Sequence, residues 1–419
     1  MTDVLDELHW RGLVAQSTDE AALRSALAEG PVTYYAGFDP TAQSLHVGHM
    51  VQLLNMRRLQ LAGHRPLALV GGATGLIGDP RPTTERSMQS PEVVAGWVER
   101  IRAQIEPFLD FEGPAAARMV NNLDWTGSMS AIDFLRDVGK HFRVGTMIAK
   151  DIVARRLHSD EGISFTEFSY QILQGMDFRE LYTRYGCTLQ LGGNDQWGNL
   201  LSGVDLIRKT EAAAVHALTS PLITKADGTK MGKSEGGAVW LDPELTSPYA
   251  FYQYWVNTAD ADVVHYLKVF TFRDQEEIDA LAQEVAERPF ARAAQKVLAG
   301  DLTTLVHGQA ATDAVIAASQ ALFGRGELRE LDERTLAGAV AELPSTVAKA
   351  GDPVVDVLVG TGLVDSKSAA RRAIAEGGAY VNNVKVTSED AVLETADLLH
   401  GRFAVVRRGK RTLGVATAE

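Results

Sequence analysis

Two short segments of the chain carry side chains whose types and spacing suit phosphate chemistry. The first is His46-Val-Gly-His49, in which two histidines three residues apart share one face of a helix that begins near Leu45. The free backbone N–H groups and the positive dipole of a first helical turn favour an anion, above all a phosphate. Gly48 leaves room there for a flat ring or a phosphate close to the backbone. With ten histidines in the chain, the plainer interpretation is a pair of surface residues.

The second segment is Lys230-Met-Gly-Lys-Ser234, within a glycine-rich stretch, 225–237, that holds three lysines. Alone, this stretch could be a solvated basic turn. Together, the two segments resemble the signatures of the class I aminoacyl-tRNA synthetases, and each departs from the commonest form at one internal position that is neither a histidine nor a lysine. The resemblance implies that six catalytic residues, with Lys225 nearby, stabilise charge on the phosphates: Thr41, His46, His49, Lys230, Lys233 and Ser234.

Composition limits the class of protein. With 45% apolar and 23% charged residues in a chain of 419, we expect a soluble globular protein with two or three domains. No apolar run is long enough to span a membrane and no secretory signal is visible. The single cysteine, Cys187, excludes an internal disulfide framework. These features predict a cytoplasmic protein.

The formal net charge of −13 argues at first against a nucleic-acid partner. Residues 352–419, however, hold nine basic and nine acidic side chains, and the basic ones form clusters around Arg371-Arg372 and Arg407-Arg408. A locally basic surface on an acidic protein is compatible with RNA binding at one end of the chain.

Strands alternate with helices over roughly 32–225, which predicts an α/β fold with a Rossmann-like, doubly wound parallel sheet. Expected strands begin near Val32, Pro66, Arg118 and Cys187, and Pro66–Val70 is apolar enough for a strand buried on both faces. The first βα turn lacks the GxGxxG fingerprint, which argues against a nicotinamide enzyme.

The pattern predicts five segments along the chain. They are a Rossmann-like catalytic domain at 1–225, a mobile lysine loop and connection at 226–246, an all-helical domain on the anticodon side at 247–323, a linker at 324–353, and a small α+β RNA-binding domain at 354–419. Because the linker is rich in Gly, Pro and acidic residues, we expect a chain cut near Gly351 to keep its fold.

A polar row on one helix face indicates the amino-acid substrate. Tyr170, Gln174 and Asp177 fall at i, i+4 and i+7 of a predicted helix. If this face points inward it needs partners or a ligand, since an unpaired buried polar group costs about 1–3 kcal/mol; the alternative is an ordinary solvated face. With Asp79 at the sheet edge and Tyr35 at the end of the first strand, these groups could bind an ammonium group and a phenol.

The whole chain, from Trp10-Arg-Gly-Leu-Val14 to Gly401-Arg-Phe-Ala-Val-Val-Arg-Arg-Gly-Lys410, resembles the bacterial tyrosyl-tRNA synthetases. The resemblance implies that Tyr35 and Asp177 bind the phenolic hydroxyl of tyrosine. It implies that Asp79, Tyr170 and Gln174 hold the α-ammonium group and that Gln196 lies on the carboxylate side. The implied ATP site comprises Asp39, His46, Gly48, His49, Gly193, Asp195, Leu222, Ile223 and Lys233.

The same resemblance implies a two-step reaction, in which tyrosine and ATP give tyrosyl-adenylate and pyrophosphate and the tyrosyl group then passes to the 3′ end of tRNA(Tyr). Mg²⁺ would bind through the ATP phosphates, without a dedicated protein metal site. A homodimer is implied as well. The implied tRNA-binding residues are Lys367, Arg371, Arg372, Arg407, Arg408 and Lys410. Many relatives carry a lysine in the loop after Gly78-Asp79-Pro80; here Arg86 is in place and Arg81 is the candidate substitute for the lysine.

Three alternatives compete with this interpretation. A tryptophanyl-tRNA synthetase shares the class, but Tyr35 opposite Asp177 suits an O–H better than an indole. A small nucleotidyltransferase would lack the lysine loop together with an RNA-binding tail. A non-catalytic RNA-binding protein would not need the intact pairs His46/His49 and Lys230/Lys233.

Overall fold

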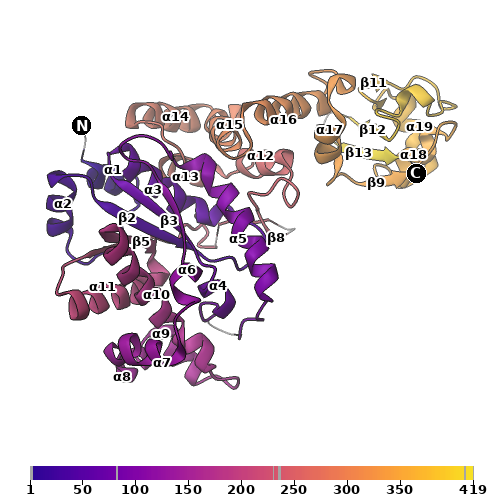
Figure 1. Ribbon diagram of the computed structural model, residues 1–419. Helices are drawn as coiled ribbons and strands as arrows, with labels where there is room; N and C mark the ends of the chain where they lie inside the picture. Colours follow the sequence, from indigo (N-terminus) through magenta and orange to yellow (C-terminus); the bar gives the residue numbers. More distant parts are fainter. Residues whose placement is uncertain (1–2, 82–83, 230, 235–236, 410–411, 419) are drawn as a thin grey trace. The chain divides into compact units, whose positions relative to one another are not determined.

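The structure is a computed structural model that describes residues 3–418 except 82–83, 230, 235–236 and 410–411. The chain divides into two units, each with its own core. Unit 1 comprises 1–242 and 258–294, and unit 2 comprises 243–257 and 295–419 (Figure 1). No helix among the described residues is long and apolar enough to cross a membrane.

The strands of unit 1 are β1 (Gln16–Ser17), β2 (Thr33–Phe38), β3 (Arg65–Val70), β4 (Arg118–Asn121), β5 (Cys187–Gly193), β6 (His216–Ser220), β7 (Lys233–Ser234) and β8 (Gly237–Ala238). Its helices are α1 (Val4–Trp10), α2 (Glu20–Glu29), α3 (Met50–Leu61), α4 (Thr74–Ile77), α5 (Pro91–Ile105), α6 (Leu123–Thr126), α7 (Ala131–Asp133), α8 (Val144–Ile148), α9 (Asp151–Leu157), α10 (Phe165–Tyr185), α11 (Trp197–Glu211), α13 (Asp260–Phe270) and α14 (Gln275–Glu287). Short 3-10 helices include η1 (Val47–His49) and η5 (Asn194–Gln196), and η3 (Phe134–Val138) is a short π-helix.

The six-stranded sheet of unit 1 has the order β1-β6-β5-β2-β3-β4. Strands β2 to β6 are parallel, and β1 joins β6 antiparallel at the edge. From β2 the chain winds outward through β3 and β4, and it returns to the other side of β2 with β5. The reversal of winding between β2 and β5 makes a topological switch point, where open α/β sheets bind ligands outside the carboxyl ends of the strands. The Rossmann-like sheet predicted from the sequence is confirmed.

Local sequence signals explain the elements that flank this point. Four consecutive apolar residues of β3, Leu67 to Val70, are buried, as expected of a strand covered on both faces. Helix α3 ends at Ala62 and is followed by Gly63 at φ 97°, a conformation that favours glycine. Helix α10 begins after Ser164, whose hydroxyl accepts the amide of Glu167, and ends at left-handed Gly186.

The core of unit 1 joins α10 to the sheet. A cluster of buried side chains includes Tyr35 of β2, Leu67 and Leu69 of β3, and Met176 and Phe178 of α10. Because α10 packs against the sheet, the face of this helix that points toward the switch point is fixed. The polar row predicted on this helix is therefore held in place by the apolar residues between its members.

Unit 2 contains the helices α12 (Pro248–Val256), α15 (Ala293–His307), α16 (Gln309–Leu322), α17 (Glu333–Val340), α18 (Val354–Gly360) and α19 (Lys367–Ala375). The first two residues of α15 are assigned to unit 1. Its strands are β9 (Ser345–Val347), β10 (Ala379–Val381), β11 (Val384–Lys385), β12 (Phe403–Arg408) and β13 (Thr412–Thr417), in the order β11-β10-β12-β13-β9. The β9–β13 pair is parallel and the others are antiparallel.

The structure divides the chain differently from the sequence prediction. Helices α13 and α14, expected in a separate domain at 247–323, belong to unit 1. The reason is visible in two buried guanidinium groups: Arg11 donates to the carbonyl oxygens of Lys268 and Thr271, and Arg58 to those of Val269 and Thr271. Both arginines thereby satisfy carbonyl groups at the end of α13, where cations are favoured. The functional domain boundaries stay a prediction.

The expected linker at 324–353 carries regular structure. It contains α17 and β9, and its Leu328, Leu331 and Leu336 are buried in one cluster with Phe403 and Val415 of the terminal sheet. A cut near Gly351 would remove the sheet side of that cluster. The expectation that such a cut exposes little core is therefore wrong. The content of Gly, Pro and acidic residues gave no sign that the leucines between them pack against the terminal sheet.

We expect Leu336→Ala to destabilise unit 2 by about 2–5 kcal/mol, because Leu336 is fully buried and the change leaves a cavity. The check is chemical denaturation followed by a probe in unit 2. Val384→Ala, at a side chain that is 69% exposed, is the matched control and should change the free energy of unfolding by less than about 0.5 kcal/mol. Equal effects of the two changes would contradict the shared cluster.

Candidate active site

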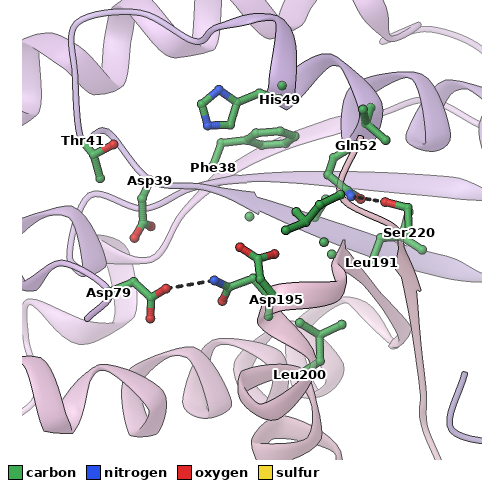
Figure 2. Close-up of a pocket in the computed structure, with 18 of the residues that line it drawn as sticks. Phe38, Asp39, Thr41, His49, Gln52, Asp79, Leu191, Asp195, Leu200 and Ser220 are labelled. Carbon is green, nitrogen blue, oxygen red and sulfur yellow. Dashed lines mark hydrogen bonds between the residues drawn. The ribbon is translucent and has the colours of Figure 1, made fainter. Parts of the chain in front are cut away.

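A cavity of about 530 Å³ lies in unit 1 at the carboxyl ends of β2 and β5. Figure 2 shows Asp39, His49, Asp79 and Asp195 facing this space from separate elements. The lining includes all of the residues predicted for tyrosine and ATP whose side chains the structure describes: Tyr35, Asp39, Thr41, His46, Gly48, His49, Asp79, Tyr170, Gln174, Asp177, Gly193, Asp195, Gln196, Leu222 and Ile223. The sequence therefore identified side chains that the fold brings into one cavity, while their roles stay predictions.

Asp177 of α10 lies at the deep end of the cavity and is 2% exposed. Its two oxygens accept hydrogen bonds from Asn122 Nδ2 at 2.9 Å and Trp125 Nε1 at 2.8 Å. Burial raises the pKa of Asp177 to about 7, while these two donors act in the opposite direction. The carboxyl group is thus oriented by neutral donors, and each oxygen keeps capacity to accept a further hydrogen bond.

Asp79 follows α4, the short helix after β3, and lies near the start of α11. It accepts hydrogen bonds from Gln196 Nε2 at 2.9 Å and Asn199 Nδ2 at 3.2 Å. Burial raises the pKa of Asp79 to about 6. Lys150, which is bound to the carbonyl of Gly198 and the hydroxyl of Ser202, has its pKa lowered by burial to about 8. A cation close to Asp79 would lower this raised pKa and so favour the ionised carboxylate.

Asp39 follows β2 and is the third carboxyl group of the cavity whose two oxygens both accept hydrogen bonds; Asp195 is a fourth carboxyl group in the lining. The hydroxyls of Thr74 and Tyr170 donate to its two oxygens, each at 2.7 Å. Burial raises the pKa of Asp39 above its ordinary value, against these hydrogen bonds. Tyr170 was predicted to contact a ligand ammonium group directly; in the structure its hydroxyl orients Asp39.

Three buried oxygen atoms of the lining have no protein partner among the described residues: the hydroxyl of Tyr35 and the side-chain Oε1 atoms of Gln174 and Gln190. Tyr35 is 2% exposed and packs on Phe178, with 5.3 Å between ring centroids. An unpaired buried polar group costs about 1–3 kcal/mol, so these atoms suit a ligand with donors and acceptors of its own.

Gln190 was missed in the sequence analysis although its signal was present. It interrupts the apolar strand Cys187-Thr-Leu-Gln-Leu191 and pairs with Tyr35 across β5 and β2. A polar side chain in the middle of a buried strand needs a partner, and Oε1 of Gln190 has none among the described residues. Gln52 of α3 was missed as well; its Nε2 donates to the hydroxyl of Ser220 at 2.7 Å on the opposite side of the cavity (Figure 2).

His46 and His49 lie together at η1, the 3-10 turn that precedes α3, with 4.0 Å between ring centroids. Nδ1 of His46 accepts the amide of Gly48, and Nδ1 of His49 accepts the amide of His46. Burial lowers the pKa of both rings, that of His49 to about 3. Each ring is therefore neutral near pH 7, and because Nδ1 is the acceptor, the proton is on Nε2 and available to an oxyanion.

Gly48 makes room for the ring of His46 and also lines the cavity. A Cβ at this position would lie 2.8 Å from Cε1 of His46. The close approach of a ligand to Gly48 stays a prediction. The absence of a side chain at 48 lets the ring fold back and accept the amide of Gly48. The glycine therefore sets the orientation of His46.

Backbone hydrogen bonds join the chain just after the lysine loop, at residues 239–241, to the turn that carries His46 and His49. The amide of Val47 donates to the carbonyl of Val239 at 3.0 Å, and the amide of Leu241 donates to that of Leu45 at 2.9 Å. Gly232, at φ 89°, lies so close to Val47 that a Cβ would be 3.1 Å from it. Lys233 and Ser234 form β7, which pairs with β8, but Lys230 and the side chains of Lys233 and Ser234 lie outside the described residues. Their predicted roles stay predictions.

The predicted tRNA-binding residues lie in unit 2. Lys367, Arg371 and Arg372 are exposed on α19, and Arg407 and Arg408 lie at the end of β12. The two groups approach each other, because Arg408 donates to the carbonyl of Leu363, just before α19. The surface is partly neutralised, since Lys367 pairs with Asp356 at 2.6 Å and Arg371 lies 4.0 Å from Glu389. Lys410 lies outside the described residues.

No group of three or more His, Cys, Asp or Glu side chains among the described residues is arranged to hold a metal ion. Of the four carboxyl groups in the lining, those of Asp39, Asp79 and Asp177 each accept hydrogen bonds from neutral donors. The cavity can therefore hold an ammonium group near the carboxylates, a hydroxyl near Tyr35 and Asp177, and phosphate oxygens near the two histidines.

Comparison with known proteins agrees with this geometry. A family model described as tRNA synthetases class I (W and Y) matches residues 27–324, and one described as tyrosine–tRNA ligase SYY-like C-terminal domain matches residues 335–415. A tyrosine–tRNA ligase of Streptomyces coelicolor is 68% identical over 414 residues, 99% of this chain and 98% of that protein.

Solved structures give the same result. A C-terminally truncated mitochondrial tyrosyl-tRNA synthetase of Aspergillus nidulans superposes with a TM-score of 0.70 at 30% identity, over 77% of this chain and 95% of that one. The corresponding protein of Coccidioides posadasii gives 0.67 at 34% identity, over 75% and 91%.

The sheet, the histidine turn and these matches define the class: the chain belongs to the class I tRNA synthetases of the tryptophan and tyrosine group. The match over the whole length then decides between the two amino acids. Within that class the chain belongs to the family of tyrosine–tRNA ligases, and the tryptophanyl alternative is not favoured.

We expect the ring of His49 to stay neutral between about pH 5 and 8, because burial lowers its pKa from 6.5 to about 3. Nuclear magnetic resonance of isotope-labelled histidine should show a proton on Nε2 and no titration of His49 in this range. The unfolded chain, in which the ring regains its ordinary pKa, is the control. Titration of His49 near pH 6.5 in the folded protein would contradict the neutral pair.

Proposed function

We propose that this member of the tyrosine–tRNA ligases activates L-tyrosine with ATP in the cavity between β2 and β5, and then transfers the tyrosyl group to the 3′ end of tRNA(Tyr). The observation that carries the proposal is the pairing, in one cavity, of an amino-acid end rich in carboxyl groups with the neutral histidine turn. The first reaction breaks the bond between the α- and β-phosphates of ATP and forms a carboxyl–phosphate bond, so that tyrosyl-adenylate and pyrophosphate are the products.

At the amino-acid end, Tyr35 and Asp177 bind the phenolic hydroxyl. Asp177 is the acceptor, because both of its oxygens already receive donors and neither donates. Asp79, Gln174 and the Asp39–Tyr170 pair surround the α-ammonium group, and Gln196 lies beside the carboxylate. The raised pKa of Asp79, caused by burial, supports this assignment, because a substrate cation would repay the cost of ionising it.

At the nucleotide end, Gly193 and Asp195 receive the ribose and the backbone at Leu222 and Ile223 receives adenine. Thr41, His46 and His49 donate to phosphate oxygens as charge moves onto pyrophosphate, and Lys230, Lys233 and Ser234 act on the same oxygens from the lysine loop. Preorganised neutral donors stabilise such charge without a change of protonation. Mg²⁺ arrives with ATP and is held mainly by its phosphates.

In the second step, basic side chains of unit 2 bind the tRNA backbone: Lys367, Arg371, Arg372, Arg407, Arg408 and Lys410. Contacts of this kind are electrostatic and weaken as salt rises. The partial pairing of Lys367 and Arg371 with acidic neighbours supports modest affinity that depends on salt. We also propose a cytoplasmic location for the protein.

The active form is a homodimer. Several large apolar side chains of one region are exposed: Ile132, Leu135, Val144, Ile148 and Phe165. They come from α7 to α8 and the start of α10, and α7, α8 and α9 lie together in Figure 1. A contiguous exposed apolar surface is typical of a protein–protein interface.

The direct test of the function is tyrosine-dependent exchange of labelled pyrophosphate into ATP, run with each of the twenty amino acids, followed by charging of tRNA. We expect exchange with tyrosine alone. Exchange supported by tryptophan, or none with any amino acid, would overturn the proposal.

We expect Tyr35→Phe to reduce the preference for tyrosine over phenylalanine by about tenfold, because the substrate hydroxyl loses one of two partners. Asp177→Asn should reduce it further, since a charged acceptor makes the stronger hydrogen bond. The measurement is the ratio of kcat/KM for the two amino acids in pyrophosphate exchange. An unchanged ratio in both variants would place the phenol elsewhere.

We expect the double variant Ile132→Asp/Phe165→Asp to be monomeric at micromolar concentration, because the two charges would be buried unpaired in the interface. Sedimentation equilibrium checks the mass. Phe290→Asp is the matched control: its side chain is 85% exposed outside this region, and the variant should remain a dimer. A monomeric wild type, or a dimeric double variant, would contradict the assignment.

A further inference from the structure

A buried ion pair lies behind the cavity, between α9 and α10. Arg156 and Glu167 are 0% and 2% exposed, and Nη2 of Arg156 is 2.8 Å from Oε2 of Glu167. Taking both charges out of water costs several kcal/mol per ion, so such a pair is weak evidence of a contribution to stability. Its other contacts indicate what it does.

The remaining N–H groups of Arg156 donate to backbone carbonyl groups that lie outside helices and strands. Nη1 donates to the carbonyls of Arg81 and Thr84, each at 3.0 Å, and Nε donates to that of Gly162 at 3.0 Å. One rigid guanidinium fork thus fixes both ends of the short segment that follows Asp79 and Pro80. Lysine, with a single point charge, could not reproduce this geometry.

Glu167, the partner of Arg156, in turn fixes Arg86. Oε1 of Glu167 accepts the backbone amide of Arg86 at 3.1 Å. The Nε of Arg86 donates to the carbonyl of Asp79 at 2.7 Å, and its aliphatic part crosses Gly78, where a Cβ would lie 2.5 Å from Cδ. Arg86 is therefore held at its amide, its stem and its Nε, and the two terminal amino groups are its remaining donors.

The held side chain lines the cavity, whereas Arg81, the candidate substitute for the missing lysine, is exposed and outside the lining. The charge of Arg86 reaches the carboxyl groups of Asp39 and Asp79, whose pKa values burial raises and Arg86 lowers. Arg86 is thus a cation of this segment that faces the reacting groups.

We propose that Arg156 and Glu167 are positioning residues of the adenylation step, which act by holding Arg86 at the cavity wall. The inference rests on the proposed function, because it concerns the charge that develops during adenylate formation. An oriented cation stabilises a transition state without reorganising, whereas a misplacement of about 1 Å can cost as much as about a hundredfold in rate. The buried pair thereby orients a segment whose described residues, 81 and 84–89, make no backbone–backbone hydrogen bond to another described residue.

The test is a double-mutant cycle in the full-length protein. Glu167→Gln keeps the size of the side chain and removes its charge, and Arg86→Gln removes the cation that it holds. Rates of adenylate formation come from rapid-quench kinetics at saturating tyrosine, and the dissociation constant of tyrosine comes from equilibrium dialysis. Arg155→Lys, at an exposed position adjacent to Arg156, is the matched control and should behave as wild type.

We expect Glu167→Gln to slow adenylate formation by about tenfold or more and to change the tyrosine dissociation constant less than about twofold. When Arg86 is already glutamine, the same change should have little further effect, because the two residues act as one unit. Equal slowing in both backgrounds, or a loss of tyrosine affinity as large as the loss of rate, would overturn the inference.

If Glu167→Gln does not fold, Arg156→Lys carries the same cycle, because it keeps the positive charge and loses the fork to Arg81 and Thr84. Failure of the inference is distinguishable from failure of the function. An active wild type with additive variants overturns only the positioning role, whereas a wild type that makes no tyrosyl-adenylate overturns the function and the inference with it.

Discussion

Four carboxyl groups line the cavity at the switch point of the sheet, and neutral neighbours hold three of them in fixed orientations. Asp39, Asp79 and Asp177 each accept hydrogen bonds from two neutral donors. Neutral donors orient a carboxylate without cancelling its charge. The cavity therefore presents negative charge and hydroxyl acceptors to a ligand that brings an ammonium group and a phenol.

The nucleotide end follows the opposite principle. His46 and His49 are neutral, and backbone amides fix them in the tautomer that exposes Nε2–H. Under the proposed function, Arg86, which is held by Glu167 and by the carbonyl of Asp79, adds a cation to these donors. The negative charge that develops on the pyrophosphate oxygens would then meet donors that are already oriented, as electrostatic preorganisation requires.

The parts that could be predicted are those with a local signal. Alternation of apolar strands and amphipathic helices predicted the parallel sheet, and the spacing of Tyr170, Gln174 and Asp177 predicted that they share one helix face, which the structure directs into the cavity. What could not be predicted depends on contacts between distant segments: Arg11 and Arg58 joining α13 to unit 1, the leucines of 324–353 meeting the terminal sheet, and the fork of Arg156. The room that Gly48 makes for the His46 ring could not be predicted either, because it depends on the orientation of that ring.

The central claim is that an ionised Asp79 receives the ammonium group of tyrosine. Burial raises the pKa of Asp79 to about 6 in the free protein, so the group is partly protonated at pH 6, and a bound cation lowers that pKa. Binding should therefore release protons at pH 6, and affinity should rise from pH 5 to pH 7. Titration calorimetry at pH 6 in buffers of different ionisation enthalpy measures the release. The account predicts proton release by the wild type that is largely lost in Asp79→Asn; binding without any net release of protons by the wild type would contradict it.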